Sequence, residues 1–180
     1  MELKTERLKL RELLLADLKK IHELHSSPET DKFNTLGIPD TIEVTHQLIS
    51  EWLATQDELP RRKFVFCAEN IEKEFIGLIG LNIGKPTYRN AEVWFKFHPK
   101  FWNQGFATEA VNRILQFSFT VLNLHRIEAG CAVENLASKR VLEKVGMIKE
   151  GQCRKKLPIR GQWVDNFEFA ILDTDFNFIK

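Results

Sequence analysis

Hydrophobic positions recur along this chain with two periods, and each change of period marks the boundary of a predicted element. Alternating apolar residues indicate strands, whereas apolar residues three or four positions apart indicate helices. Strands are expected over residues 8–11, 64–69, 75–83, 91–97, 126–133, 148–156 and 162–172. Helices are expected over residues 17–26, 41–56, 108–122 and 135–146. The order β-α-α-β-β-β-α-β-α-β-β predicts an α+β fold, a mixture of helices and strands around one sheet.

The bulk properties limit the class of protein. The 180 residues contain no linker, internal repeat or low-complexity segment, so residues 1–180 are interpreted as one domain long enough to bury a core. A net charge of +1 provides no general attraction to nucleic acid or to a membrane surface. The sequence has no apolar run of about 18 residues and no apolar leader after Met1. We therefore expect a cytoplasmic protein with neither nucleic acid nor membrane as a partner; a homodimer stays open.

The cysteines and histidines indicate no metal site. Cys67, Cys131 and Cys153 form no closely spaced pair, and an odd number does not fit a disulfide framework. Cys67 and Cys131 are expected to be buried strand residues. The five histidines are scattered, so no metal is predicted.

One segment has the features of an anion site. Residues 103–108 lie between a strand and a long apolar helix, and Gly105 is placed where the backbone turns. The first amides of a helix have no partner within the helix and can bind a phosphate. A simple tight turn explains a single glycine equally well, so the spacing alone does not decide between the two.

A family resemblance adds to this interpretation. Residues 101–110 read Phe-Trp-Asn-Gln-Gly-Phe-Ala-Thr-Glu-Ala. They resemble the acetyl-CoA loop of the GNAT superfamily, in its ribosomal-protein N-terminal acetyltransferase (RimJ/RimL-like) branch. The superfamily pattern Gln/Arg-x-x-Gly-x-Gly/Ala is matched at Gly105 and Ala107, with Trp102 at its first position.

Three further stretches resemble the branch in the same order along the chain. They are residues 5–11, its opening strand; residues 134–147, its Asn-x-x-Ser helix and following Gly-Phe step; and residues 161–165, its late hairpin. The resemblance implies a curved mixed sheet of about seven strands, splayed at its centre, with about four flanking helices. It also implies an enzyme that transfers acetyl from acetyl-CoA to a primary amine by direct attack in a ternary complex. The cofactor would contact Phe95, Lys96, Phe97, Asn103, Gln104, Gly105, Phe106, Ala107, Thr108, Asn135 and Ser138.

The residues that move protons are less well defined. The superfamily often uses a late tyrosine as the acid, but the one tyrosine here is Tyr88, and Phe169 stands in the expected region. Ser138 matches the serine of the branch and is a candidate for the acid; it could equally lie in the first turn of a helix capped by Asn135.

Glu92 is the first candidate for the base, because the branch often has a carboxylate at this position and an attacking ammonium must lose its proton. A solvated strand glutamate is the alternative. His98 is the second candidate, and Asp165 and Glu168 are weaker ones.

The acceptor is not identified by the sequence. A pocket is expected between the two early helices, the Ile38-Pro39 region and residues 156–163, lined by Phe33, Trp52, Trp94 and Trp163, which could also be core residues. A peptide N-terminus and a small amine both fit.

A non-catalytic CoA-binding protein and an unrelated nucleotide-binding protein are the alternatives to an enzyme, although no Gly-x-Gly-x-x-Gly or Gly-Lys-Ser/Thr motif supports the latter.

Overall fold

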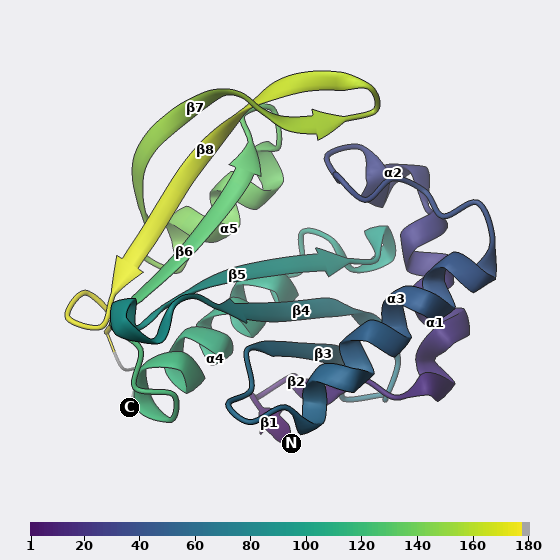
Figure 1. Ribbon diagram of the computed structural model, residues 1–180, viewed down its shortest axis with the longest axis horizontal. Helices are drawn as coiled ribbons and strands as arrows, with labels where there is room; N and C mark the ends of the chain where they lie inside the picture. The colour runs from purple at the N-terminus through teal and green to yellow at the C-terminus, as the bar shows by residue number, and fades with distance from the viewer. Residues whose placement is uncertain (178–180) are drawn as a thin grey trace.

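An eight-stranded sheet organises the protein, whose computed structural model describes residues 1–177 (Figure 1). The strands are β1 (Glu2–Lys4), β2 (Leu8–Glu12), β3 (Lys63–Asn70), β4 (Phe75–Ile83), β5 (Asn90–Phe97), β6 (Arg126–Ala132), β7 (Ile148–Ile159) and β8 (Gln162–Leu172). The helices are α1 (Leu18–Ser26), α2 (Pro28–Asp31), α3 (Ile42–Ala54), α4 (Phe106–Thr120) and α5 (Leu136–Lys144). Four 3-10 turns complete the order: η1 (Leu15–Asp17), η2 (Thr55–Asp57), η3 (Pro86–Tyr88) and η4 (Pro99–Phe101).

The predicted α+β fold is confirmed, with two additional elements. The predicted count of about seven strands misses β1, which has three residues and is too short to show a period. The predicted count of about four helices misses α2, a single turn of four residues that begins with Pro28. The helix expected from residue 108 begins two residues earlier, because Gly105 already starts it.

The centre of the sheet is open, as expected. The strand order is β1-β2-β3-β4-β5-β6-β8-β7, and β5 and β6 are parallel while every other neighbouring pair is antiparallel. β5 and β6 pair only at Asn90↔Arg126, Ala91↔Ile127 and Glu92↔Glu128. Beyond these pairs the two strands diverge (Figure 1), which leaves a V-shaped gap toward the carboxyl end of β5.

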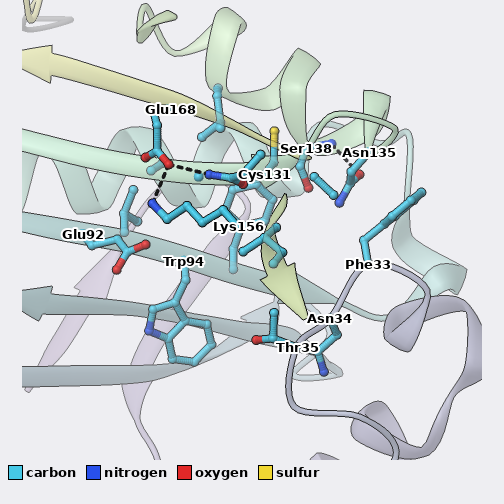
Figure 2. A pocket seen from close by; sticks show the side chains of 18 residues that line it. Phe33, Asn34, Thr35, Glu92, Trp94, Cys131, Asn135, Ser138, Lys156 and Glu168 are labelled. Atoms are coloured by element: carbon cyan, nitrogen blue, oxygen red, sulfur yellow. Dashed lines mark hydrogen bonds and ion pairs between the residues drawn. The ribbon is translucent and has the colours of Figure 1, made fainter. Parts of the chain in front are cut away.

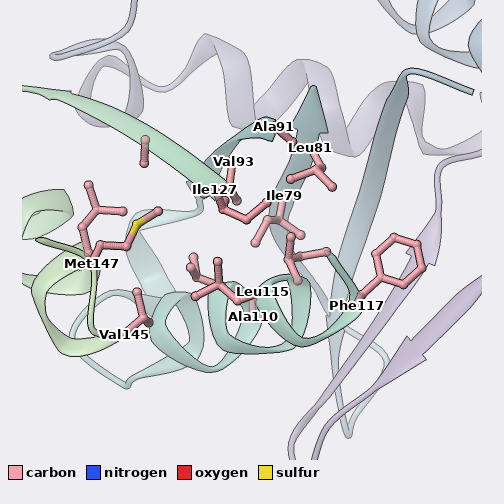
Figure 3. Packing of buried hydrophobic residues seen from close by; sticks show 14 of the residues in the cluster. Ile79, Leu81, Ala91, Val93, Ala110, Leu115, Phe117, Ile127, Val145 and Met147 are labelled. Carbon is pink, nitrogen blue, oxygen red and sulfur yellow. The ribbon is translucent and has the colours of Figure 1, made fainter. Parts of the chain in front are cut away.

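Each face of the sheet has its own core. α4 buries Ala110, Ile114 and Leu115 completely against the larger core (Figure 3). On the other face, Ile21 of α1 and Ile49 of α3 are fully buried with residues of β3 and β4. Apolar residues around most of α4 explain why so many of its side chains are buried. This packing holds the N-terminus of α4 beside the open ends of β5 and β6.

The β7–β8 hairpin reaches over the gap toward α2 (Figure 1). At its tip, Arg160 Nε donates to Asp31 Oδ2 at 3.2 Å and Arg160 Nη2 donates to the Pro28 carbonyl at 3.1 Å. The hairpin and the α2 segment therefore close one side of the gap between β5 and β6. Within residues 1–177, no helix is long and apolar enough to cross a membrane.

Candidate active site

Two adjoining cavities occupy the gap between β5 and β6. The larger has a volume of about 700 Å³ and lies among the end of β5, the start of α4 and α5. The smaller has a volume of about 260 Å³ and lies among β5, β6, α5 and the β7–β8 hairpin. Both are lined by Phe33, Asn34, Phe95, Asn135 and Ser138. A molecule in the larger cavity can thus present one end to a molecule in the smaller.

The turn before α4 gives the larger cavity an anion-binding wall. Asn103 and Gly105 have φ values of +60° and +84°, in the left-handed region that glycine tolerates best. The first backbone hydrogen bond of α4 is donated by Glu109 N to the Gly105 carbonyl, at 3.0 Å. The amides of the three preceding residues, Phe106, Ala107 and Thr108, are therefore available to a phosphate beside the positive end of the helix dipole.

Arg7 holds this turn from a distant part of the sequence. Arg7 Nη1 donates to the Gln104 carbonyl at 3.0 Å, and Arg7 Nη2 pairs with Glu109 Oε2 at 2.6 Å. The guanidinium also lies over the Phe106 ring, 4.7 Å from its centroid. Sequence reasoning did not find Arg7 as a site residue, because its partners lie about a hundred positions away.

Cations line the larger cavity at several points. Arg140 and Lys144, one turn apart on α5, are exposed at its edge together with Lys32. Lys96 differs from them, because its Nζ is buried and has no hydrogen-bond partner among the described residues. Burial lowers the pKa of Lys96 to about 8, although Asp31 acts in the opposite direction. These charges suit an anionic ligand with several phosphates.

Glu92 marks one end of the smaller cavity (Figure 2). Its side chain reaches the cavity from the last paired position of β5. Partial enclosure by protein raises its pKa, with Lys156 acting against the shift and Glu168 and Glu128 adding to it. A carboxylate with a raised pKa is a better proton acceptor near neutral pH than an ordinary glutamate.

Glu168 lies close to Glu92 but is already paired. Lys156 Nζ donates to Glu168 Oε1 at 2.5 Å, and Asn166 Nδ2 donates to the same oxygen at 2.7 Å. Burial acts to raise the pKa of Glu168, but the hydrogen bonds from Lys156 and Asn166 outweigh it, so the pKa is lowered. Glu168 is therefore the weaker base of the two carboxylates.

Ser138 and Asn135 lie at the opposite end of the smaller cavity, where the two cavities meet (Figure 2). Asn135 caps α5, because its Oδ1 accepts a hydrogen bond from Ser138 N at 3.1 Å. The capping role considered from the sequence is therefore present. It also holds the backbone of Ser138, a residue that lines both cavities.

The other expected cofactor residues divide between lining and supporting positions. Phe95, Lys96, Phe97, Asn103, Gly105, Phe106, Ala107 and Thr108 line the larger cavity. Gln104 does not line it; its Nε2 donates to the Lys100 carbonyl at 3.0 Å. The side chain of Gln104 thus stabilises the turn from behind.

Two expected bases and two expected aromatic residues lie outside the smaller cavity. His98 Nδ1 accepts from Lys100 N at 3.3 Å, and Asp165 accepts from Lys155 N and Gln152 Nε2 within the hairpin. Trp52 packs against Trp94 with ring centroids 5.7 Å apart, and 60% of Trp163 is exposed. Phe33 and Trp94 do line the cavity.

Metal ligands do not gather at the site. No group of three or more His, Cys, Asp or Glu side chains that could hold a metal ion occurs in residues 1–177. Cys67 and Cys131 are both buried, as expected for strand residues.

Comparison with known proteins assigns a family to this arrangement. The family described as Acetyltransferase (GNAT) domain matches residues 7–148. An uncharacterized N-acetyltransferase of Bacillus subtilis (strain 168) is 32% identical over 179 residues, which cover 98% of this chain and 100% of the relative. Spermidine N(1)-acetyltransferase of Vibrio cholerae is 30% identical, over 94% of this chain and 95% of the relative.

Solved structures agree with the sequence matches. The crystal structure of spermidine N-acetyltransferase from Vibrio cholerae in complex with CoA and spermine has a TM-score of 0.84 and 28% identity, over 95% of this chain and 98% of that chain. An acetyltransferase (GNAT family) from Bacillus anthracis has a TM-score of 0.84 and 31% identity, over 97% and 99% of the two chains.

Proposed function

The chain belongs to the GNAT acetyltransferase family, and on that premise we propose that it acetylates the primary amine of a small molecule with Glu92 as the general base. The donor is acetyl-CoA, which the family uses. The larger cavity fits this donor, because it is lined by the start of α4, with its unpaired amides, and by the cations Lys32, Arg140 and Lys144. When bound, acetyl-CoA supplies the thioester that the amine attacks.

The position of Glu92 carries the proposal. An alkylammonium has a pKa of about 10 and must lose a proton before it can attack. Glu92 lies in the smaller cavity with a raised pKa, and Ser138 lies where that cavity meets the larger one. An amine between them can donate its proton toward Glu92, directly or through a water, while Ser138 hydrogen-bonds the departing sulfur.

A small acceptor is favoured by the size and shape of the smaller cavity. Its volume of about 260 Å³ is closed on one side by the Phe33–Thr35 segment and on another by Lys156 and Leu157. Relatives from Vibrio cholerae and Escherichia coli are named as spermidine acetyltransferases, and spermidine is a small amine. The second candidate acceptor is a protein N-terminus, which the RimJ/RimL-like resemblance of the sequence implies. The cytoplasmic location stays a prediction, and a homodimer stays open.

An acceptor screen tests the proposal. Wild-type protein is incubated with acetyl-CoA and either small mono- and diamines or short peptides with free N-termini, and products are identified by mass. We expect thiol release and acetylated product with small amines. Turnover with peptides and with no small amine would instead support the N-terminal acetyltransferase. Tight acetyl-CoA binding without any product would remove Glu92 from a catalytic role.

A further inference from the structure

One end of the smaller cavity contains more hydrogen-bond acceptors than donors. We call Glu92, Lys156, Asn166 and Glu168 the distal cluster; all four line this cavity. Figure 2 shows Glu92, Lys156 and Glu168 together, away from Ser138 and Asn135. The cluster contains two carboxylates and one amide but a single ammonium, that of Lys156. A ligand group that donates hydrogen bonds is therefore better suited to it than one that accepts them.

Asn166 is the member whose bonding is incomplete. The residue is only 2% exposed, and its Oδ1 has no hydrogen-bond partner among the described residues. Its Nδ2 donates to Glu168 Oε1 at 2.7 Å. That contact fixes the orientation of the amide, because a carboxylate cannot donate to Oδ1. A buried carbonyl oxygen without a donor is costly, so a donor from a ligand would stabilise it.

The strand opposite Asn166 is built to accommodate its amide. On β6, Gly130 is paired with Glu168, two positions from Asn166, and a Cβ added at Gly130 would lie 2.8 Å from Asn166 Nδ2 and 3.3 Å from Oδ1. A larger residue would therefore displace the amide. The absence of a side chain at Gly130 keeps Asn166 facing the cavity beside Glu168.

Lys156 donates to Glu168 of the distal cluster from a position that is largely exposed to solvent. Its side chain is 51% exposed, while that of Glu168 is 32% exposed. An ion pair with this much solvent contact contributes little to stability, about 0–1 kcal/mol. The long lysine side chain can therefore leave Glu168 for solvent at small cost.

We propose that Lys156 stands in for a second ammonium group of the acceptor, and that a diamine displaces it to donate hydrogen bonds to Glu168 and Asn166. The inference rests on the proposed function and extends it to the acceptor's distal group. The charged groups facing this position are Glu92, Glu168 and Lys156, while Glu128 behind them is paired with Arg126 at 2.7 Å. A carboxylate on the acceptor would instead meet two other carboxylates.

The test compares matched acceptors. KM is measured for 1-aminobutane and 1,4-diaminobutane with wild-type protein, Lys156→Met and Lys155→Met. Both variants remove one positive charge from adjacent positions of β7, but Lys155 does not line the cavity. We expect Lys156→Met to increase the preference for the diamine, expressed as the ratio of the two KM values, by about fivefold. Lys155→Met should keep the wild-type ratio, and adding Glu168→Gln to Lys156→Met should abolish the gain.

Three other results would contradict this inference or the proposed function. An active Lys156→Met enzyme with the wild-type ratio overturns this inference and leaves the proposed function intact. A wild-type preference for 4-aminobutanoate that Lys156→Met abolishes also overturns it, because Lys156 would then bind an anion. Failure of the wild-type protein to acetylate any amine overturns the proposed function itself, and this inference with it.

Discussion

Glu92 and Glu128 face each other in the last residue pair that joins β5 to β6. From this pair onward the strands diverge, and the smaller cavity begins. The backbone register of the sheet therefore sets the position of the proposed base. Glu128, by contrast, does not line the cavity and pairs with Arg126 at 2.7 Å. The two glutamates are therefore expected to differ in function, because one reaches the cavity and the other pairs with an arginine.

Replacing Glu92 tests its role as the base. We expect Glu92→Gln to lower kcat tenfold or more, toward the loss of about 100- to 10,000-fold that is typical of a missing general base. Glu128→Gln is the matched control and should retain kcat within about twofold. Steady-state thiol release with a saturating amine measures both. Equal losses in the two variants would indicate a disturbed sheet instead of a lost base.

The pH dependence gives an independent test of Glu92. Its pKa is raised, chiefly by its enclosure, and a protonated carboxyl cannot accept a proton. The acid limb of kcat/KM should therefore lie above the ordinary range of glutamate, about 4.3. The limb should be absent from Glu92→Gln. A variant that keeps the wild-type limb would remove Glu92 from the role.

Replacing Ser138 separates its chemistry from helix capping. Ser138→Ala should lower kcat about tenfold, the effect of losing one hydrogen bond of roughly 1.4 kcal/mol to the departing sulfur, with little change in Tm. Asn135→Ala should instead lower the free energy of unfolding by about 1 kcal/mol, because Asn135 Oδ1 accepts from Ser138 N at 3.1 Å. Thermal unfolding and thiol release measure the two effects. Wild-type turnover in Ser138→Ala would exclude the hydroxyl from the mechanism.

The sequence predicted the parts of the site that are local along the chain. Gly105 and the amides of the α4 start follow from a strand-turn-helix pattern, and the capping role of Asn135 follows from its spacing to Ser138. The fold followed from the periodicity together with the family resemblance. These features depend on residues a few positions apart, which is the range over which period and capping rules hold.

The parts that escaped prediction depend on contacts distant in sequence. Arg7 meets Glu109 across 102 positions, and the contact of Lys156 with Glu168 depends on how β7 pairs with β8. That pairing shifts register between Cys153 and Leu157, so alternation alone misplaces the residues beyond it. The place of the Asn166 amide likewise depends on another strand, because a side chain at Gly130 of β6 would press against it.

Arg7 should support cofactor binding through the Gln104 carbonyl. We expect Arg7→Gln to weaken acetyl-CoA binding about tenfold, the effect of losing roughly 1.4 kcal/mol of charge-assisted hydrogen bonds. Arg113→Gln is the control, because Arg113 Nε also joins α4 to the N-terminal strands, donating to the Lys4 carbonyl at 3.0 Å, without contacting the cofactor turn. Calorimetric titration with acetyl-CoA measures both. Equal weakening in both variants would show that Arg7 acts through general stability alone.

Gly105 should be sensitive to a side chain for a reason specific to the turn. Its φ of +84° strains any residue with a Cβ, by about 1–2 kcal/mol. Gly161, at the tip of the β7–β8 hairpin, has a φ of +74° and open space around it. Alanine at either position should lower Tm similarly, but only Gly105→Ala should raise the Kd for acetyl-CoA. Matching Kd values in the two variants would contradict a phosphate-binding role for this turn.

Lys96 gives a stability prediction that does not depend on catalysis. Its Nζ is buried without a hydrogen-bond partner, and burial lowers its pKa from 10.5 to about 8. Between these pH values the unfolded chain binds more protons than the folded protein, so stability attributable to Lys96 rises with pH. The destabilisation is complete below pH of about 8 and vanishes above about 10.5.

Lys96→Met should therefore stabilise the cofactor-free protein at pH 7, by about 1 kcal/mol or more, which corresponds to roughly 2–4 °C in Tm. The gain should shrink as the pH rises toward 10, because the lysine of the folded wild-type protein is then already neutral, and only the charge that remains on the lysine of the unfolded chain still opposes folding. Lys63→Met, on an exposed lysine of β3, is the control and should show no such pH dependence. Tm values measured at pH 7 and pH 10 for the wild-type protein and both variants test this pH dependence. A gain that is equal at both pH values would arise from packing of the methionine and would contradict a buried charge at Lys96.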